Sequence, residues 1–440
     1  MKEFFNKISK KMLEQIHADE VMIINFDAEI SNFIRLNNSK IRQAGNVKQL
    51  DLSLSLIYKK KIHTSSIRLS GNIDRDIDTL IKSLNYLRRE MPELSADPYL
   101  LYSKKNQSSS ISNCKSTLNS KEIIKNILDD IKNDELVGIF SSGNIYRGFA
   151  NSFGQFNWHE STSFNFDWSL YNSNDKAIKQ NYAGIDWDHN KFIKILNEGK
   201  LKLSVLNNKE IKLQPGPQRV YLSPAALNEI IDMMSWGGFS YKANRIGSSP
   251  LHLMTKGDKR LNKDVTITED LSSGIIPNFH EDGFIKPEKI ELIKSGQYNT
   301  SLISPRSALE YSVEHNAAEY YESPVAVEIK PGNIPSDNIT ECLKDGIYIS
   351  NLWYLNFSDK NNARVTGLTR FGCFQVKDGE YIGPINTMRF DETIYNILGE
   401  NLFGLTNNQD MLMDCSTYEG RSAYSSTLPG AIVDEFKMTL

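Results

Sequence analysis

Arginine and aromatic residues gather in one stretch near the end of the chain, between Gly346 and Asp391. Arginine presents a planar fork of hydrogen-bond donors that can clamp a carboxylate or a peptide carbonyl. Aromatic rings beside such a group offer apolar surface with a polar rim. The residues that we consider for binding an extended peptide here are Trp353, Tyr354, Arg370 and Arg389.

The same stretch also fits an amphipathic sheet with no binding role. With a strand's period of two, one face carries Ile347, Ile349, Trp353, Leu355 and Phe357, and the pattern breaks at Asn351 and Leu352. In that interpretation the aromatic residues are half-buried, and Asp359 or Asp391 braces the arginines inside the fold. The residues alone leave both interpretations open.

Hydrolytic chemistry with a metal would need histidines at a defined spacing, and the chain does not offer them. His159-Glu160 and His280-Glu281 are followed by no second histidine four or five residues on, so we expect ordinary hydrogen-bonded histidines there. Four cysteines without a CxxC pair predict reduced thiols rather than a structural zinc site. The chain also lacks a GxSxG elbow, a P-loop and a GxGxxG motif.

Strands and long helices are predicted for the first half of the chain. An amphipathic helix opens the chain and ends near residues 17–19, and strands are expected at 21–27, 31–36, 47–58 and 61–69. Asn72 caps a helix that ends at Met91-Pro92. Residues 103–120, rich in serine, asparagine and lysine, predict a mobile loop. A second helix follows over 123–131.

Further strands are expected at 136–140, 144–150 and 156–171, before a helix at 188–198. Proline and glycine at 214–217 then mark a domain boundary near residue 215. A helix begins at Pro224 and runs to about Ser235, and another starts at Ser304-Pro305. Short alternating segments such as 265–269 and 289–294 predict a β-rich second domain. The fold class is therefore α+β in two domains, 1–215 and 216–440.

Composition narrows the class of protein. Lysine and arginine number 51 against 54 for aspartate and glutamate, a net charge of −3 that disfavours a general nucleic-acid-binding surface. The N-terminus carries charges within its apolar run, unlike a signal peptide, and no stretch of about 18 apolar residues could span a membrane. We expect a soluble cytoplasmic protein.

Several segments resemble the TldD/PmbA family, whose members are often labelled modulators of DNA gyrase and include metallopeptidase subunits. They occur in the family's order: "SNFIRLNNSKIRQ", "GNIYRGFANSFGQ", "FDWSLY", "PGPQRVYLSPAALNEI", "SPRSALEY", the run from Gly346 to Asp391, and "STLPGAIVDEF". The resemblance spans roughly residues 20 to 440. Because the pieces are many and their order is kept, chance is a poor explanation.

The resemblance implies a metal helix that this chain lacks. Catalytic members carry HExxxH, in which two histidines bind zinc and the glutamate takes a proton from the metal-bound water. Alignment of "LSPAALNEIIDMMSWGG" with that helix places Asp232, Met233 and Gly237 at the histidine, glutamate and histidine positions. Cys415 lies near a family position for a further metal ligand, and we expect a free thiol there.

The chain thus resembles the PmbA, or TldE, subunit type. The resemblance implies no cofactor in this chain, zinc only in a TldD-like partner, and a dimer that encloses and positions peptide substrates for proteolysis. Two other functions remain open: a metallopeptidase that acts alone through an unrecognised site, and a non-proteolytic interaction protein that modulates gyrase. Substrate identity and the choice between homodimer and heterodimer do not follow from the sequence.

Overall fold

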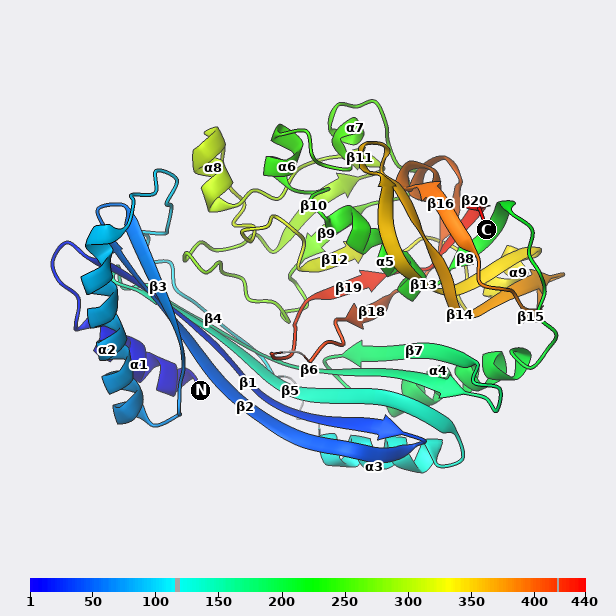
Figure 1. The fold of residues 1–440 in the computed structure, drawn as a ribbon, viewed down its shortest axis with the longest axis horizontal. Coiled ribbons are helices and arrows are strands. Elements are labelled where there is room, and N and C mark those ends of the chain that lie inside the picture. Colours follow the sequence, from blue (N-terminus) through cyan, green and yellow to red (C-terminus); the bar gives the residue numbers. More distant parts are fainter. Residues whose placement is uncertain (115–118, 418) are drawn as a thin grey trace.

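The computed structural model describes residues 1–114, 119–417 and 419–440. Over these residues helices and several sheets mix as the predicted α+β class requires (Figure 1). Within the described residues, no helix is long and apolar enough to cross a membrane. The proposed boundary near residue 215 falls just before β8 (Gly216–Leu222) and stays a prediction.

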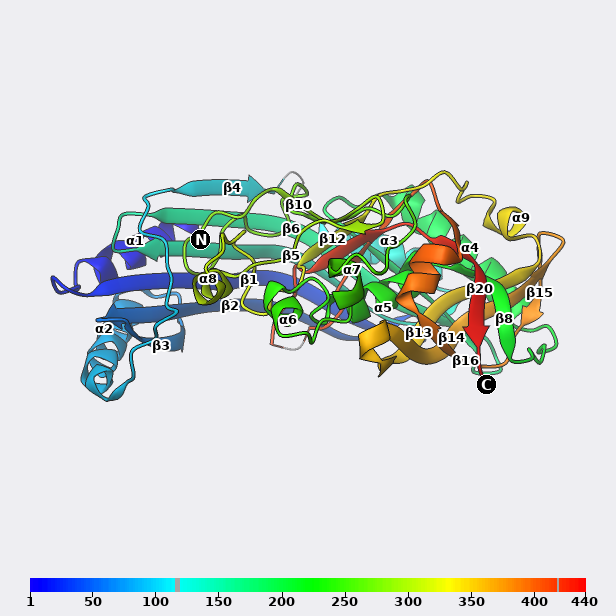
Figure 2. The ribbon, with the colours of Figure 1, turned by 90° about the horizontal axis from the view of Figure 1, so that it is seen from above.

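The first half of the chain builds one long, curved sheet. Its strands run in the order β3-β2-β1-β5-β6-β4, which Figure 2 shows from above, and β7 pairs with the other end of β6. All neighbours are antiparallel except β4 and β6. The strands are β1 (Val21–Asn37), β2 (Lys40–Tyr58), β3 (Lys61–Arg68), β4 (Ser109–Asn113), β5 (Glu135–Asn151), β6 (Phe156–Tyr171) and β7 (Ala177–Gly184).

Four helices cover one face of this sheet. Even-numbered residues of β6 such as Trp158, Phe164 and Trp168 are buried against them, because side chains alternate between the faces of a strand. The helices α1 (Lys2–Leu13) and α2 (Ile73–Glu90) pack at one end, and α3 (Ser120–Ile131) and α4 (His189–Val205) at the other. The Asn72 side chain caps α2, as predicted.

The opposite face of the sheet is polar and still buried. His159, Ser161, Ser163 and Asn165 of β6 are each at most 5 % exposed, because the second half of the chain covers them. Figure 1 shows that half lying over the sheet. This contact therefore consists of hydrogen bonds as well as apolar packing.

Some expected elements of the first half differ in the structure. The segments 21–27 and 31–36 form one strand, as do 136–140 and 144–150, because the residues between them continue the extended backbone. Glu29 is buried there, and the Ser142 hydroxyl lies 2.7 Å from that of Ser120 at the start of α3. The opening helix ends at Leu13, and the helix predicted for 188–198 continues to Val205. The other predicted strands of this half are present.

The prediction of a mobile loop over 103–120 is wrong for residues 109–113. They form β4, and the backbone N–H of Ser109 donates to Asn157 Oδ1 at 2.8 Å. The side chains of "SSISN" are polar, yet their backbone adds a parallel strand to β6, which composition does not reveal. Residue 120 begins α3, and residues 115–118 lie outside the described part of the chain.

The second half of the chain contains two further sheets. One has the order β11-β10-β9-β12-β19-β18; in the other, β13-β8-β20-β16-β14 closes into a ring through pairing of β13 with β14. The first consists of β9 (Ile267–Asp270), β10 (Lys289–Lys294), β11 (Gln297–Tyr298), β12 (Ala326–Ile329), β18 (Asp410–Met413) and β19 (Ser425–Leu428). The ring and its extensions comprise β8, β13 (Gly346–Asp359), β14 (Arg364–Lys377), β15 (Glu380–Pro384), β16 (Arg389–Thr393), β17 (Leu402–Leu405) and β20 (Ala431–Met438).

Helices of the second half are mostly short. The predicted starts at Pro224 and Pro305 are confirmed, with Ser223 and Ser304 as side-chain caps. These helices are α5 (Pro224–Ser235), α6 (Tyr241–Arg245), α7 (His252–Thr255), α8 (Pro305–Tyr311) and α9 (Ile339–Leu343). Helix α5 packs against β13, β8 and β19, so its remaining face is available to a cavity.

Candidate functional site

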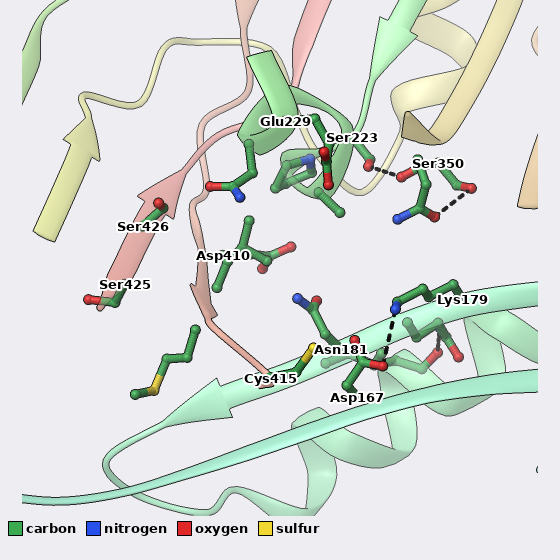
Figure 3. A pocket seen from close by; sticks show the side chains of 18 of the residues that line it. Asp167, Lys179, Asn181, Ser223, Glu229, Ser350, Asp410, Cys415, Ser425 and Ser426 are labelled. Carbon is green, nitrogen blue, oxygen red and sulfur yellow. Dashed lines mark hydrogen bonds and ion pairs between the residues drawn. The ribbon is translucent and has the colours of Figure 1, made fainter. Parts of the chain in front are cut away.

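A cavity of about 810 Å³ lies between the two halves of the chain (Figure 3). Helix α4 and strand β7 form one wall; helix α5, strand β18 and the start of β13 form the other. Figure 3 shows Glu229 and Asp410 on one side and Asp167, Lys179 and Cys415 on the other. The cavity therefore brings together residues more than 200 positions apart in the sequence.

Helix α5 presents one polar face to this cavity. Ser223 starts the helix by accepting the N–H of Ala226, and Pro224 occupies its first turn. Asp232 follows Glu229 by three residues and Asn228 by four, so these side chains share the helix face that lines the cavity. The intervening apolar residues, including Met233, are buried in the core.

The α5 carboxylates are held in an environment that disfavours their charge. Burial raises the pKa of Glu229 to about 7, the neighbouring Asp232 adds to the rise, and Lys179 opposes it. Burial and Asp414 raise the pKa of Asp232 to about 6, although its side chain is open to the cavity. Protein surrounds that cavity, so the Asp232 carboxylate has lost much of its hydration although no other side chain of the described residues covers it.

Asp410 and Tyr221 line the same cavity. Burial raises the pKa of Asp410, against the opposing effect of Lys191 and Lys202. Tyr221 is only 7 % exposed, and burial holds the pKa of its hydroxyl above the usual range. Lys202 Nζ donates to the hydroxyl of Tyr348 at 2.8 Å, and Lys179 lies 3.2 Å from Asp167.

The positions that correspond to the family's metal helix do not form a metal site. Asp232 and Cys415 both line the cavity, but Met233 is buried and Gly237 lies beyond the end of α5 with φ +85°. Among the described residues, no group of three or more His, Cys, Asp and Glu side chains is arranged to hold a metal ion. The residues present therefore do not fit the zinc chemistry of catalytic relatives.

The two His-Glu pairs are held in ordinary hydrogen bonds, as predicted. His159 is fully buried, and its Nε2 lies 2.9 Å from the carbonyl of Gly274. His280 Nδ1 accepts the N–H of Asp282 at 3.0 Å. Burial lowers the pKa of each imidazole to about 4, which keeps both histidines neutral near pH 7.

Three of the candidate peptide-binding residues come together on the β13–β14 hairpin. The Arg370 guanidinium lies 4.6 Å from the centre of the Trp353 ring and 5.2 Å from that of Phe371. Tyr354 stacks obliquely beside Trp353, with ring centres 5.7 Å apart. Trp353 is 50 % exposed, whereas Ile347 and Ile349, which the period of two places on the same face, are buried, because bulges on either side of Trp353 change the alternation.

Both strands of the hairpin hold an aromatic residue in the left-handed region. Tyr354 has φ +58° and Phe371 has φ +57°, a conformation that costs a bulky residue roughly 1 kcal/mol or more. The Lys179 ammonium lies 6.0 Å from the Phe371 ring, and Lys179 lines the cavity. We call Arg370 with Trp353, Tyr354 and Phe371 the Arg370 surface. Through the contact of Phe371 with Lys179, this surface adjoins the wall of the cavity.

Arg364 lies elsewhere on the hairpin, and Arg389 lies on β16, the strand that pairs with β14. Arg389 Nε donates to the Thr366 hydroxyl at 3.0 Å, and it does not lie over Trp353. Arg364 lies 3.6 Å from Asp391, so the bracing considered for the arginines occurs there. Neither Asp359 nor Asp391 forms an ion pair with Arg370 among the described residues.

Sequence reasoning missed Glu229, Asp410 and Tyr221 as cavity residues. Glu229 could have been found, because it precedes Asp232 by three residues on a helix whose apolar face was recognisable. Asp410 and Tyr221 carry no such signal, since their approach depends on how separate sheets pack.

Comparison with known proteins places the chain in a family. Residues 215–440, just over half the chain, match the family described as PmbA/TldA metallopeptidase C-terminal domain. The fold also resembles solved structures over nearly the full length. No curated protein sequence matches the chain.

Three solved structures illustrate the likeness of fold. TldE from Thermococcus kodakarensis is 14 % identical with a TM-score of 0.78, covering 99 % of this chain and 100 % of that one. A proposed modulator of a DNA gyrase from Thermotoga maritima is 14 % identical with a TM-score of 0.73, covering 99 % of each chain. Another from Bacteroides thetaiotaomicron is 15 % identical with a TM-score of 0.73, covering 100 % of this chain and 98 % of that one.

The protein is thus of the metallopeptidase-related class that this fold and C-terminal region define. It belongs to the TldD/PmbA family.

Proposed function

We propose that this chain is a non-catalytic, PmbA/TldE-like subunit that helps a TldD-like peptidase enclose and position peptide substrates. The observation that carries the proposal is the α5 wall of the cavity. By the resemblance, α5 corresponds to the family's metal helix, but Asp232, Met233 and Gly237 cannot supply two histidines and a glutamate. Zinc and the attacking water would then belong to the partner alone.

Two strand edges beside the cavity support a positioning role. Strand β7 pairs only with β6, and β18 pairs only with β19, among the described residues. Residues of both strands, such as Lys179 and Leu412, line the cavity. An extended peptide can add to such an edge by main-chain hydrogen bonds, which hold it without reading its sequence.

The Arg370 surface would receive the peptide outside the cavity. Trp353, Tyr354 and Phe371 surround a guanidinium that has no carboxylate partner among the described residues, so its donors remain for a peptide carbonyl or carboxylate. Arg389 adds positive charge on β16, the strand that pairs with β14. The role assigned to all four residues depends on a peptide that follows β13 and β14.

Reconstitution with a family member that carries HExxxH tests the proposal. We expect the purified chain to contain no stoichiometric zinc and to cleave no unstructured peptide, whereas the pair forms a dimer and cleaves. One zinc per chain with chelator-sensitive cleavage by this chain alone would instead support a peptidase that acts by itself. A monomer under all conditions, which leaves the partner's cleavage unchanged, would contradict the subunit role.

A further inference from the structure

Several hydrogen-bond acceptors face the main cavity without a donor. The carboxylates of Glu229 and Asp410 form no hydrogen bond and no ion pair with any described residue. The Tyr221 hydroxyl, on a side chain that is 93 % removed from solvent, also has no protein partner in the described part of the chain. Buried polar groups are normally paired, so the Tyr221 hydroxyl leaves bonding capacity for a ligand. The half-buried carboxylates of Glu229 and Asp410 line the same cavity and can bind the same ligand.

Each lysine that lines the cavity contacts a group other than Glu229 and Asp410. Lys179 is paired with Asp167, and Lys194 with Asp337 at 2.8 Å. Lys202 donates to Tyr348, and the Lys191 ammonium lies over the Tyr182 ring at 5.4 Å. Lys179, Lys191 and Lys202 act on Glu229 and Asp410 only from a distance and form no ion pair with them in the described part of the chain. The cavity lining carries seven Asp and Glu residues against four lysines, so its carboxylates outnumber its cations.

Asn228 shows the same imbalance. Its Nδ2 donates to Asp232 at 3.0 Å, which fixes the orientation of the amide, and its Oδ1 is left without a partner. On α5, the amide N–H of Asn228 is therefore used within the helix, and the amide oxygen of Asn228 remains free to accept a hydrogen bond from a ligand. A ligand that complements this wall must bring donors and positive charge.

We propose that the cavity selects extended peptides with a lysine or arginine side chain, which it holds between Glu229 and Asp410. The proposal rests on the proposed function and adds the class of substrate. Ammonium and guanidinium groups supply donors and neutralise the two carboxylates, and an ion pair inside a cavity is less screened than one at the surface. A metal ion is a poorer occupant, because the described residues offer no set of ligands arranged for one.

Peptides that differ only in charge provide the test. An otherwise uncharged, labelled ten-residue peptide carries arginine at its centre in one version and citrulline, its neutral isostere, in the other. Fluorescence anisotropy is measured with the chain alone and in the reconstituted complex. We expect the arginine peptide to bind roughly tenfold more tightly than the citrulline peptide.

Isosteric variants locate the effect. Glu229→Gln and Asp410→Asn should each reduce the preference for arginine and leave the affinity for citrulline unchanged, which also shows that the variant is folded. Glu291→Gln is the matched control, because Glu291 lies on β10 outside this cavity and pairs with Lys294. It should keep the full preference.

The outcomes separate this inference from the function on which it rests. Equal affinity for the two peptides, absence of binding by either, or an undiminished preference in both cavity variants overturns the inference. If cleavage by the complex still requires this chain, the proposed function survives that result. If the partner cleaves equally well without this chain, the proposed function fails as well.

Discussion

Glutamates with opposite roles occupy two regions of the molecule, the buried contact between α6 and α8 and the wall of the main cavity. Glu322, only 1 % exposed, accepts four hydrogen bonds: from the Ser240 and Ser304 hydroxyls and from the backbone N–H groups of Lys242 and Ser304, at 2.6 to 3.1 Å. It ties the starts of α6 and α8 together. Glu229, facing the cavity, accepts none from the described residues.

The arginines show the same contrast. The guanidinium of Arg421 crosses to the first-half sheet, where it donates to the Ser31 hydroxyl, the Gly143 carbonyl, and the carbonyl and hydroxyl of Ser163. Gly143, with φ +147°, permits the close approach of β5 to β1 at this contact, because it has no Cβ to collide with the Ile30 carbonyl. Arg370 has only aromatic faces beside its guanidinium.

Saturation is what separates the two regions. A buried polar group with every bond satisfied holds the fold in one arrangement and has nothing left to offer a ligand. A polar group with unused bonds costs stability in the free protein and repays that cost only when a ligand arrives. Substitutions should therefore damage stability at Glu322 and Arg421 and damage binding at Glu229 and Arg370.

The largest loss of stability is expected for Glu322→Ala. It leaves two backbone N–H groups and two hydroxyls without their acceptor, which should cost about 3 kcal/mol or more. Thermal and denaturant unfolding would both show a lowered midpoint. The exposed Glu291→Gln is the control; an equal effect of both variants would remove the contrast.

Arg421→Met should cost about 2 kcal/mol, because Ser31, Ser163 and the Gly143 carbonyl lose their donor while the methionine keeps most of the apolar contact. Hydrogen exchange should rise at residues 419–428 and at the facing positions of β1 and β5. Exchange at α8 serves as the internal control, because Figure 1 shows α8 well away from the connection between β18 and β19, the segment that contains Arg421. Unchanged exchange at the contact would show that other bonds, such as Asn165 Nδ2 to the Met413 carbonyl, suffice.

Glu229→Gln should change how the free energy of unfolding depends on pH more than it changes the free energy of unfolding at any one pH. Because the folded-state pKa of about 7 exceeds the ordinary value of 4.5, the folded protein binds a proton that the unfolded chain has released between those values. This contribution is present below about pH 4.5 and is lost as pH rises through about 7. The variant should therefore gain about 1 kcal/mol relative to the parent between about pH 5 and pH 8, after allowance for solvent in the cavity. A parallel pH profile for the two proteins would contradict this.

Local patterns predicted much of the fold. The cap at Asn72, the helix starts at Pro224 and Ser304-Pro305 and the alternation of β6 identify elements correctly, because hydrogen bonds and side-chain periodicity within a few residues decide them. β4 was missed, since a polar segment became a strand through pairing with a distant partner.

The candidate site was predictable only in part. The helix with Asp232 and the position of Cys415 followed from resemblance, and both residues line the cavity. The exposure of Trp353 did not follow, because bulges in β13 break the period of two. Asp410 and Tyr221 face the cavity through the packing of two sheets, a relation that no local spacing records.

The smallest change in stability is expected for Arg370→Ala. This variant tests whether a side chain with unused hydrogen-bond donors serves binding rather than stability. Arg370 is exposed and its guanidinium contacts only rings, so the melting point should change by the equivalent of less than about 0.5 kcal/mol. Peptide affinity in the reconstituted complex should fall roughly tenfold, because a charge-assisted contact to a carbonyl or carboxylate is lost. Arg364→Ala, which removes the pair with Asp391 on the same hairpin, is the matched control: it should lower the melting point slightly and leave affinity intact. A clearly lower melting point with unchanged affinity for Arg370→Ala would make this arginine a structural residue, and the surface around Trp353 would then lose its assignment as a peptide contact.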